Sequence, residues 1–375
     1  MSVNFSEADK QHMALAIELA KKGHYTTSPN PRVGCVIVKN HEIVGKGFHE
    51  KAGEPHAEVH ALRAAGNKAN GATAYVTLEP CSHYGRTPPC ALGLINANVR
   101  RVVIAMVDPN PQVSGNGIKM LEDAGIEVST GLLEDEALAL NPGFIHLMKY
   151  GMPFVRCKLA SSLDGKTAMA SGESKWITGA LAREDVQRLR AQSCAVITSA
   201  QSVITDNAKM NVRWDQLGEL KNSYPKDNLR QPVRVVIDSK SRLTPELEFF
   251  SIPSKIIIIG TGLENNHTWP HFVEHITVKS VSGQIDLEDC LQQLAKRGLN
   301  DILLECGATL AGAFVEQNLV HELTLYQAPK LLGGDGKNLI ETPSITKLSD
   351  AKQLSIDEMT MVGNDIKIVA KLTEK

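Results

Sequence analysis

Apolar residues recur with two different periods along the first 150 positions. Between residues 6 and 22 they return every three or four positions, which predicts an amphipathic helix capped at Ser6. Short continuous apolar runs between polar turns predict buried strands instead. The expected strands span 33–38, 43–49, 72–78, 102–107 and 125–128, and further helices are expected to begin at 55, 90, 119 and 133, the last running to 148. Because strands and helices alternate, the pattern predicts an α/β domain.

A second domain is expected where the pattern turns strand-like again, at residues 148–152, without a linker rich in Pro, Gly or Ser. We therefore predict two domains, residues 1–150 and 151–375. The expected strands of the second domain are 154–160, 195–199, 233–238, 255–260, 301–305, 321–328 and 365–372, and its helices are 180–191, 287–297 and 309–317. The order is again α/β. No Gly-x-Gly-x-x-Gly follows its first strand, so a Rossmann dinucleotide domain is not supported.

The composition narrows the class of partner. The chain has 375 residues, 42% hydrophobic and 22% charged, with a net charge of −2, so no general electrostatic attraction draws it to nucleic acid or acidic lipid. No run approaches the roughly 20 apolar residues of a membrane span, and the polar N-terminus has no secretory apolar stretch. The seven scattered cysteines indicate reduced thiols. We expect a cytoplasmic protein with small-molecule substrates.

The most informative stretches are His56-Ala57-Glu58 and the pair Cys81 and Cys90, the first of which follows Pro80. One imidazole and two thiolates suit tetrahedral Zn²⁺ with a fourth position open for water. Glu58 could take a proton from that water and deliver it to a departing amine, as in zinc nucleobase deaminases. The alternative is a structural zinc site with His83 as its fourth ligand.

A second, weaker indication lies at 305–310, where a strand is followed by Gly307 and the start of a helix. Glycine lets a ligand approach the backbone, and a helix N-terminus favours phosphate. The alternative is a strand–helix turn that uses glycine only for packing.

Eight residues (82–89) separate the two cysteines, whereas ordinary zinc nucleobase deaminases have two between them. This segment, 80–90, and the turn 28–34 resemble the deaminase half of the bifunctional riboflavin-biosynthesis deaminase–reductases. Its reductase half is similar at 158–160, 162–165, 174–177, Asp206 and 305–307. The resemblance covers both halves of the chain in the family's order.

The resemblance implies an N-terminal cytidine-deaminase-like α/β/α sandwich and a C-terminal dihydrofolate-reductase-like α/β domain. It implies Zn²⁺ and NADPH as cofactors, pyrimidine ribose phosphates as substrates, and a homo-oligomer, commonly a dimer or tetramer. The first domain would deaminate 2,5-diamino-6-ribosylamino-4(3H)-pyrimidinone 5′-phosphate. The second would reduce the ribosyl group of the product to ribityl.

The resemblance also assigns residues. In the deaminase, Glu58 would be catalytic, His56, Cys81 and Cys90 would hold zinc, and the substrate would meet Asn30, His49, His83, Arg86, Asp108 and Asn110. In the reductase, Lys158 and Asp206 would be catalytic, and Ser174, Arg190, Met210, Arg213 and Glu305 would contact the substrate. The dinucleotide would meet Ala160, Trp176, Ser202, Asp206, Gly307, Ala308, Thr309, Leu310, Ala311, Gly312 and Ala313.

Several of these roles have a structural alternative. Arg190 and Arg213 suit a fork for the 5′-phosphate, but could be an exposed helix arginine and a loop arginine. Lys158 could donate a proton or be a structural lysine. For the whole chain, the alternatives are a nucleic-acid-editing deaminase with a C-terminal binding module and a non-catalytic zinc protein with a nucleotide-sensing half. The 5% aromatic content and the net charge speak against the first of these.

Overall fold

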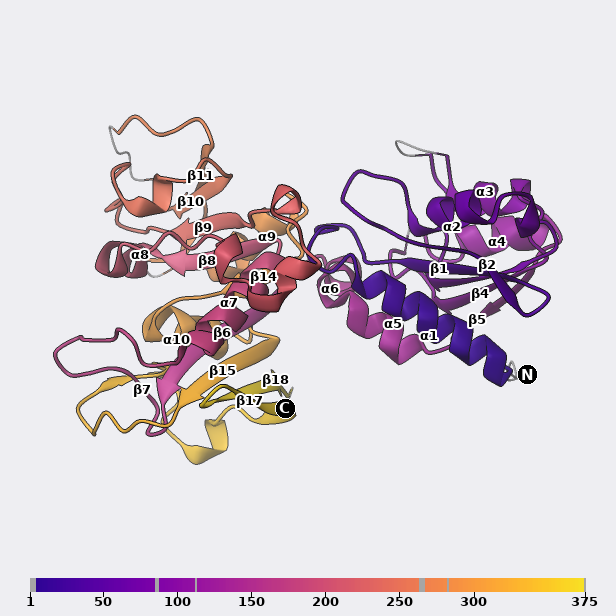
Figure 1. The fold of residues 1–375 in the computed structure, drawn as a ribbon. Coiled ribbons are helices and arrows are strands. Elements are labelled where there is room, and N and C mark those ends of the chain that lie inside the picture. The colour runs from indigo at the N-terminus through magenta and orange to yellow at the C-terminus, as the bar shows by residue number, and fades with distance from the viewer. Residues whose placement is uncertain (1–4, 85–87, 112, 263–266, 282, 374–375) are drawn as a thin grey trace. The chain divides into compact units, whose positions relative to one another are not determined.

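The chain divides into two compact units, Met1–Gly151 and Met152–Lys375 (Figure 1). The structure is a computed structural model that describes residues 5–84, 88–111, 113–262, 267–281 and 283–373. The last helix of the first unit ends at Gly151, whose φ of 69° is the left-handed conformation that stops a helix. Within the described ranges, no helix has the length and apolar character that crossing a membrane requires.

The first unit is built on a mixed sheet. Its strands are β1 (Gly34–Lys39), β2 (Glu42–Phe48), β3 (Thr73–Leu78), β4 (Arg101–Met106) and β5 (Glu127–Thr130). Over the described residues they form one five-stranded sheet in the order β2-β1-β3-β4-β5. β1 runs antiparallel to both neighbours, and β3, β4 and β5 are parallel. Asn40 and His41, both with positive φ, make the predicted turn between β1 and β2.

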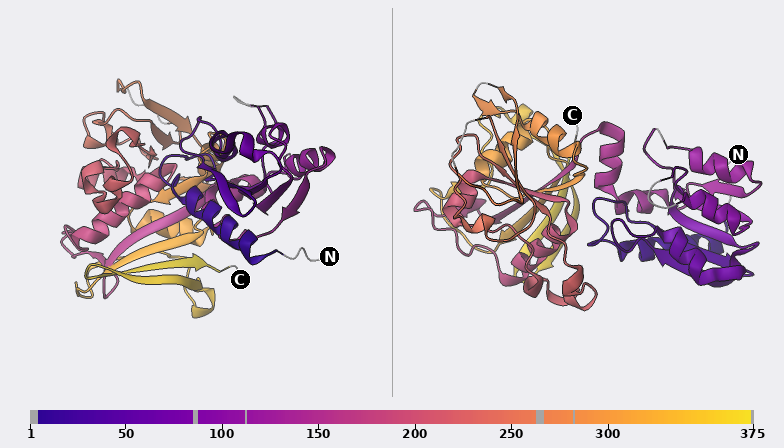
Figure 2. Two further views of the ribbon diagram at one scale, coloured as in Figure 1. Left: turned by 45° about the vertical axis from the view of Figure 1, so that its right-hand side comes forward. Right: turned by 90° about the horizontal axis from the view of Figure 1, so that it is seen from above.

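Helices cover both faces of this sheet (Figures 1 and 2). They are α1 (Glu7–Lys21), α2 (Ala57–Ala65), α3 (Cys90–Asn96), α4 (Asn116–Asp123), α5 (Glu134–Leu140) and α6 (Pro142–Tyr150). α1 and α5 lie on one face, and α2, α3 and α4 lie on the other. α1 begins in the predicted place, because Ser6 and Asp9 cap each other's backbone N–H groups.

One helix expected from the sequence is two helices in the structure. The sequence predicts a single helix from 133 to 148, whereas the structure breaks it at Asn141 into α5 and α6. Pro142 disfavours helical backbone at the residue before it and suits the first position of a new helix. The buried Asn141 amide turns instead to Arg32, accepting from its N–H at 2.7 Å and donating to its C=O at 2.9 Å.

The second unit is built on a larger sheet. Its strands are β6 (Phe154–Ser162), β7 (Lys166–Ala168), β8 (Ala195–Ser199), β9 (Val233–Ile237), β10 (Ile256–Gly260), β11 (Val273–Thr277), β12 (Ser280–Val281), β13 (Gln284–Ile285), β14 (Asp301–Leu304), β15 (Glu322–Ala328), β16 (Lys337–Asn338), β17 (Leu354–Val362) and β18 (Asp365–Leu372). As far as the chain is described, nine strands form the order β11-β10-β9-β8-β14-β6-β15-β18-β17. The strands from β11 to β15 are parallel, and β18 and β17 are antiparallel.

The helices of this unit are α7 (Ala180–Gln192), α8 (Ala200–Asp206), α9 (Leu287–Ala295) and α10 (Ala308–Glu316). α7 and α8 bury apolar side chains in the core on one face of the sheet, and α9 and α10 do so in the other core. Strands β8 and β14 are neighbours in the sheet, and each is followed directly by a helix, α8 and α10 respectively. These two helices pack on opposite faces, so the chain turns in opposite directions at two adjacent strand ends. This arrangement opens a crevice at the carboxyl ends of parallel strands.

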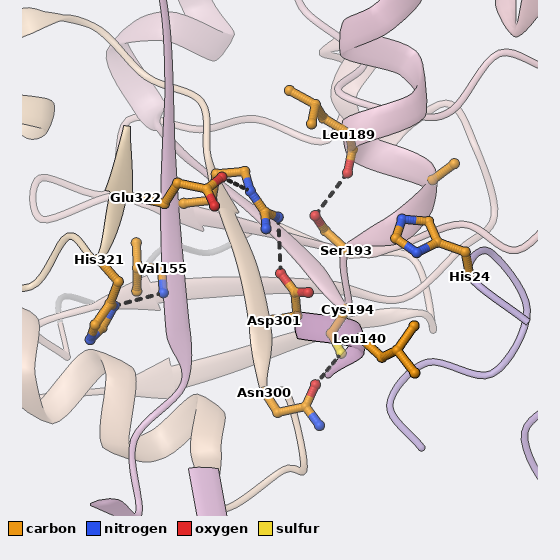
Figure 3. Close-up of polar contacts among 12 residues, drawn as sticks. His24, Leu140, Val155, Leu189, Ser193, Cys194, Asn300, Asp301, His321 and Glu322 are labelled. Atoms are coloured by element: carbon orange, nitrogen blue, oxygen red, sulfur yellow. Dashed lines mark hydrogen bonds and ion pairs between the residues drawn. The ribbon is translucent and has the colours of Figure 1, made fainter. Parts of the chain in front are cut away.

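A buried ion cluster joins three central strands near their amino ends (Figure 3). Arg156 on β6 donates to Glu322 on β15, and its Nη1 donates to Asp301 on β14 at 3.3 Å. Burial alone would lower the pKa of Arg156, but the two carboxylates raise it. The cluster holds the end of the sheet opposite the crevice.

Among the described strands and α-helices of this unit, those not expected from the sequence are β7, β11, β12, β13, β16, β17 and α8. β17 lies at the sheet edge with most of its side chains exposed, so it lacks the buried apolar run that marks a strand. β11 is the other edge strand and buries one residue of five. α8 has seven residues, too few to display a helical period.

Candidate active sites

The three proposed zinc ligands meet at one point of the first unit. His56 caps the start of α2, Cys81 follows β3, and Cys90 is the first residue of α3. Nδ1 of His56 lies 3.7 Å from Sγ of Cys81 and 3.3 Å from Sγ of Cys90, and the three ligand atoms all lie within 4.8 Å of one another. Two helix starts and a strand end thus bring together residues that are up to 34 positions apart.

This donor set fits Zn²⁺. One nitrogen and two sulfurs at mutual contact distance supply three corners of a tetrahedron. Hydrogen bonds from the Cys90 thiol and from His56 lower the pKa of Cys81, which favours the thiolate that metals bind. In the described part of the chain the cluster holds His56, Cys81 and Cys90, and His83 is exposed outside it. The structural-zinc alternative, which needs His83 as a fourth ligand, is therefore not supported.

Glu58 lies in the first turn of α2 beside the cluster. Its side chain is buried, and within the described residues its Oε2 has no hydrogen-bond partner. Burial raises the pKa of Glu58. A buried carboxylate with one unsatisfied oxygen and a raised pKa suits a group that accepts a proton and returns it.

A cavity of about 200 Å³ opens beside these residues. Nδ1 of His49 lies 3.1 Å from the Pro55 C=O, so it carries the proton, and Nε2 accepts from the Asn30 amide at 3.3 Å. Burial lowers the pKa of His49, which keeps the ring neutral. The lining consists of Asn30, Pro31, Val33, His49, His56, Glu58, Leu78, Glu79, Cys81, His83, Asp108 and Phe144.

Not every expected deaminase residue lines this cavity. Asn110 lies outside the lining, and its N–H donates to Oδ1 of Asp108 at 2.9 Å, which makes it part of the turn that carries Asp108. Arg86 lies outside the described residues. Glu79 also lines the cavity but was not predicted as a site residue. Its position between a buried strand and Pro80-Cys81 could have identified it from the sequence.

The second unit has its own pocket, of about 500 Å³, in the crevice at the carboxyl ends of β6, β8 and β14. Most of the expected reductase residues line it, namely Lys158, Ala160, Ser174, Trp176, Arg190, Ser202, Asp206, Met210, Arg213, Glu305, Gly307 and Ala308. The rest of the expected cofactor contacts do not. Ala311 and Gly312 are buried in α10, and Ala313 packs against the same core, because this face of the helix covers the sheet.

Thr309 and Leu310 belong to the first turn of α10. The side chain of Thr309 bonds Glu341 at 2.8 Å and lies outside the pocket lining. Leu310 packs against the core. Their backbone N–H groups are still among those that a helix start leaves without an intrahelical acceptor. Of the dinucleotide contacts expected at residues 307–313, the structure therefore leaves available Gly307, Ala308 and the backbone N–H groups of Thr309 and Leu310.

A buried charge cluster forms the polar side of the pocket. Arg190 donates to both carboxylate oxygens of Glu305, each at 2.8 Å, and Nζ of Lys158 lies 4.0 Å from Glu305 Oε1. Burial alone would raise the pKa of Glu305, but Arg190 and Lys158 lower it to about 2. Burial lowers the pKa of Lys158, an effect that Glu305 partly offsets.

This geometry bears on the expected arginine fork. Arg190 is not an exposed helix arginine, because its guanidinium is buried against Glu305 and the Asn211 C=O, and it lines the pocket. Arg213 is exposed at the pocket and keeps its side chain toward solvent. The two arginines therefore differ, since the Arg190 side chain is engaged by Glu305 and that of Arg213 is exposed.

Two polar lining residues of α7 were missed, as was the apolar Val186. Arg183 lies 4.6 Å from the Trp176 ring, and Gln187 is buried with its Oε1 accepting from the Arg213 N–H at 2.9 Å. Arg183, Gln187 and Arg190 recur at helical spacing on one face of the helix, a signal that could have found them.

The comparisons with known proteins match both units separately. Residues 6–106 match the model of the cytidine and deoxycytidylate deaminase zinc-binding region, and residues 153–368 match that of the RibD C-terminal domain. The riboflavin biosynthesis proteins RibD of Haemophilus influenzae and Escherichia coli are 52% and 53% identical to this chain. The first alignment covers 98% of each chain, and the second covers 96% of this chain and 98% of the relative.

The chain belongs to the RibD family. Solved structures agree. Acinetobacter baumannii RibD, form 1, superposes with a TM-score of 0.90 at 44% identity, over 98% of this chain and 99% of that one. A Thermotoga maritima diaminohydroxyphosphoribosylaminopyrimidine deaminase/5-amino-6-(5-phosphoribosylamino)uracil reductase superposes with a TM-score of 0.85 at 34% identity, with the same coverage.

Membership of the RibD family confirms the expected fold class and the expected resemblance. A zinc-binding deaminase domain precedes a reductase domain, in the family's order. A nucleic-acid-editing deaminase with a binding module is not favoured, because RibD proteins match the whole chain and not its first half alone.

Proposed function

We propose that this chain catalyses two consecutive steps of riboflavin biosynthesis. The first unit would remove the 2-amino group of 2,5-diamino-6-ribosylamino-4(3H)-pyrimidinone 5′-phosphate by hydrolysis. The second would reduce the ribosyl group of the product with NADPH, giving 5-amino-6-(5-phospho-ribitylamino)uracil. The observation that carries the proposal is a ligand triad with a buried, half-satisfied Glu58 in one unit and a separate charged pocket in the other.

For deamination, His56, Cys81 and Cys90 would hold Zn²⁺. When bound in such a site, Zn²⁺ lowers the pKa of a coordinated water to about 7. Glu58 would take the proton of the attacking water and pass it to the departing nitrogen, which leaves as ammonia. Its unpartnered Oε2 and the raised pKa that burial gives it support both transfers.

For substrate binding, the neutral His49 and Asn30 form one wall of the first cavity, and Asp108 lies on another. The half-buried amide of Asn30 can meet the polar edge of a pyrimidine without adding charge. We assign His83 to the exposed sugar-phosphate side, because it lines the cavity mouth and is itself exposed.

For reduction, NADPH supplies the hydride, which C1′ of the ribose accepts. Lys158 would donate the proton that the opening ring oxygen takes up, so that the C1′–O bond breaks as the C1′–H bond forms. Its place on β6 in the pocket and the nearby carboxylate of Glu305 support this role over that of a structural lysine. Gly307 and Ala308 at the start of α10, with Ser202 and Asp206 of α8, would hold the dinucleotide.

We also propose that a second copy of this chain covers the edge strand β17. A β-bulge between Ile356 and Glu358 keeps Leu354, Ile356, Met359 and Met361 on one face. These four large side chains are between 46% and 63% exposed. An antiparallel pairing of two β17 strands would extend the sheet and bury both sets. Sedimentation should give a dimer or larger, and Met359→Lys with Met361→Lys should give monomers.

We also propose a cytoplasmic location, which is supported by the absence of disulfide bonds among the seven cysteines, all of which lie in the described residues. The activity is tested by incubating the zinc-loaded protein with the diamino substrate and NADPH and following the products by mass spectrometry. Exchange of an amino group for oxygen, followed by hydrogenation of the ribose, is expected. A product that is only hydrogenated would contradict the deaminase assignment.

A further inference from the structure

The deaminase cavity has a second buried carboxylate, Glu79, which the proposed chemistry does not use. Glu79 is 4% exposed and directly follows β3, two residues before the proposed ligand Cys81. One oxygen, Oε2, accepts from the N–H groups of Asp108 at 3.1 Å and Gly115 at 3.0 Å. The other, Oε1, accepts from those of Gly117 at 2.9 Å and Ile118 at 3.3 Å.

These contacts separate Glu79 from Glu58. A carboxylate offers about four lone-pair sites, and four backbone N–H groups occupy those of Glu79. Glu58, in the same cavity, keeps one oxygen without a partner in the described part of the chain. Oε2 of Glu58 is therefore available to exchange a proton. Both carboxylate oxygens of Glu79, in contrast, are occupied by hydrogen bonds from the backbone.

The backbone that Glu79 holds joins two parts of the site. Asp108, which lines the cavity, follows β4, and Gly115 caps α4 without a side-chain hydrogen bond of its own. The carboxylate of Glu79 supplies that missing cap from a different strand. Close packing keeps the junction tight, since a Cβ on Gly117 would lie 2.0 Å from the Pro80 C=O. The strand end that delivers Cys81 and the loop that delivers Asp108 are thus fixed to each other.

We propose that Glu79 is a positioning residue for deamination, which sets the place of Asp108 at the substrate. The inference rests on the proposed function of the first unit. Without the carboxylate, four N–H groups lose their acceptor, and the 108–118 segment can shift relative to the cavity. Glu79 is outside the cluster of His56, Cys81 and Cys90, and backbone N–H groups occupy its oxygens, so it would act through Asp108.

The test is a double-mutant cycle on the full chain. Glu79→Gln, Asp108→Asn and the double variant are compared for the KM and kcat of ammonia release, with bound zinc measured in each. We expect Glu79→Gln to raise KM about tenfold and to retain zinc, because the ligand triad is untouched. We expect the double variant to be no worse than Asp108→Asn alone, because both substitutions remove one effect. NADPH oxidation with pre-deaminated substrate is the internal reference.

Two further variants keep the result decisive. Asp9→Asn removes another buried, helix-capping carboxylate of the same unit, distant in the sequence from the cavity, and should leave KM unchanged. If Glu79→Gln does not fold, Glu79→Asp keeps the charge at a shorter reach and should show a smaller rise in KM. The inference would be overturned if the KM increases of the two single variants multiplied in the double variant. It would also be overturned if Glu79→Gln lost its bound zinc. If the wild type releases no ammonia, the proposed function itself fails, which is a different result.

Discussion

Arg190 and Glu305 face each other across the reductase pocket through two hydrogen bonds of 2.8 Å, from Nε to Oε2 and from Nη2 to Oε1. The residues are 115 positions apart, on α7 and at the end of β14. Both are largely buried, so each neutralises a charge that would otherwise be costly to bury. The charges of this pair also affect the pKa of Lys158, which Glu305 raises and Arg190 lowers.

Glu305→Gln should therefore have two effects, a loss of stability and a shift in the pH dependence of reduction. Removing one partner of a buried pair costs roughly 3 kcal/mol of stability. It also removes the charge that raises the pKa of Lys158, leaving burial to lower it further. If Lys158 acts as the proton donor, reduction fades as the pH rises through that pKa, so the fall in rate should move to lower pH. The pH–rate profile of NADPH oxidation measures this.

The matched control for that substitution is Glu316→Gln. Glu316 is a surface carboxylate of the same unit that accepts from Ser344, and neutralising it should leave the profile in place. An unshifted profile in Glu305→Gln would remove Lys158 from the proton transfer.

Zinc removal should divide the two activities. Cys90→Ser replaces one of three ligands and should reduce both bound zinc and ammonia release to near background, because a hydroxyl is a far poorer zinc ligand than a thiolate. Reduction of pre-deaminated substrate should persist, since its pocket lies in the other unit. Cys290→Ala, at a buried cysteine of α9 outside the cluster, is the control and should retain zinc. Atomic absorption and the two assays report the outcome, and full zinc content in Cys90→Ser would contradict the ligand set.

Asp9 should make the first unit less stable in acid. Burial alone would raise the pKa of Asp9, but hydrogen bonds from Tyr75 and Ser6, with the Arg101 charge, lower it. A lowered folded-state pKa stabilises the fold above the unfolded-state value of about 4, and this contribution is lost as the pH falls through the folded-state pKa.

Asp9→Asn should accordingly cost roughly 2 kcal/mol at neutral pH, with the difference from wild type shrinking in acid. Hydrogen exchange of the amides in α1 and β3 measures the local free energy of unfolding. A difference that stays constant from pH 7 to pH 3 would show that the carboxylate charge does not contribute.

Asn141 should couple the break between α5 and α6 to the deaminase cavity. Its amide bonds both the N–H and the C=O of Arg32, next to the cavity residues Asn30 and Pro31. Asn141→Ala removes the two buried hydrogen bonds to the Arg32 backbone and should cost roughly 2 kcal/mol. The KM of deamination should rise while the KM of reduction stays constant. Equal changes in both would place the effect elsewhere.

The sequence predicts best what depends on neighbouring residues. The proposed zinc ligands could be named from the sequence because His56, Glu58 and Pro80-Cys81 sit in short motifs whose spacing is typical of zinc deaminases. Strands β8 and β18 were predicted with their observed bounds. In β8 four of the five residues are buried, and burial of this kind produces a continuous apolar run in the sequence.

Long-range relationships were out of reach. Glu79 bonds amides that follow it by 29 to 39 positions, and nothing in the local pattern names these partners. The ion pair of Arg190 with Glu305 joins residues 115 positions apart, so the sequence does not show it. β17 was missed because its apolar side chains are exposed, so tertiary context and not periodicity defines it.

The central claim, two independent active sites in one chain, is tested most directly by one coupled assay. Wild type and Glu58→Gln are given the diamino substrate and NADPH, and ammonia release and NADPH oxidation are recorded separately, with pre-deaminated substrate as a second input. We predict that Glu58→Gln stops ammonia release and still oxidises NADPH at the wild-type rate with the pre-deaminated substrate. Loss of both activities in Glu58→Gln with zinc bound, or ammonia release at the wild-type rate, would contradict the account.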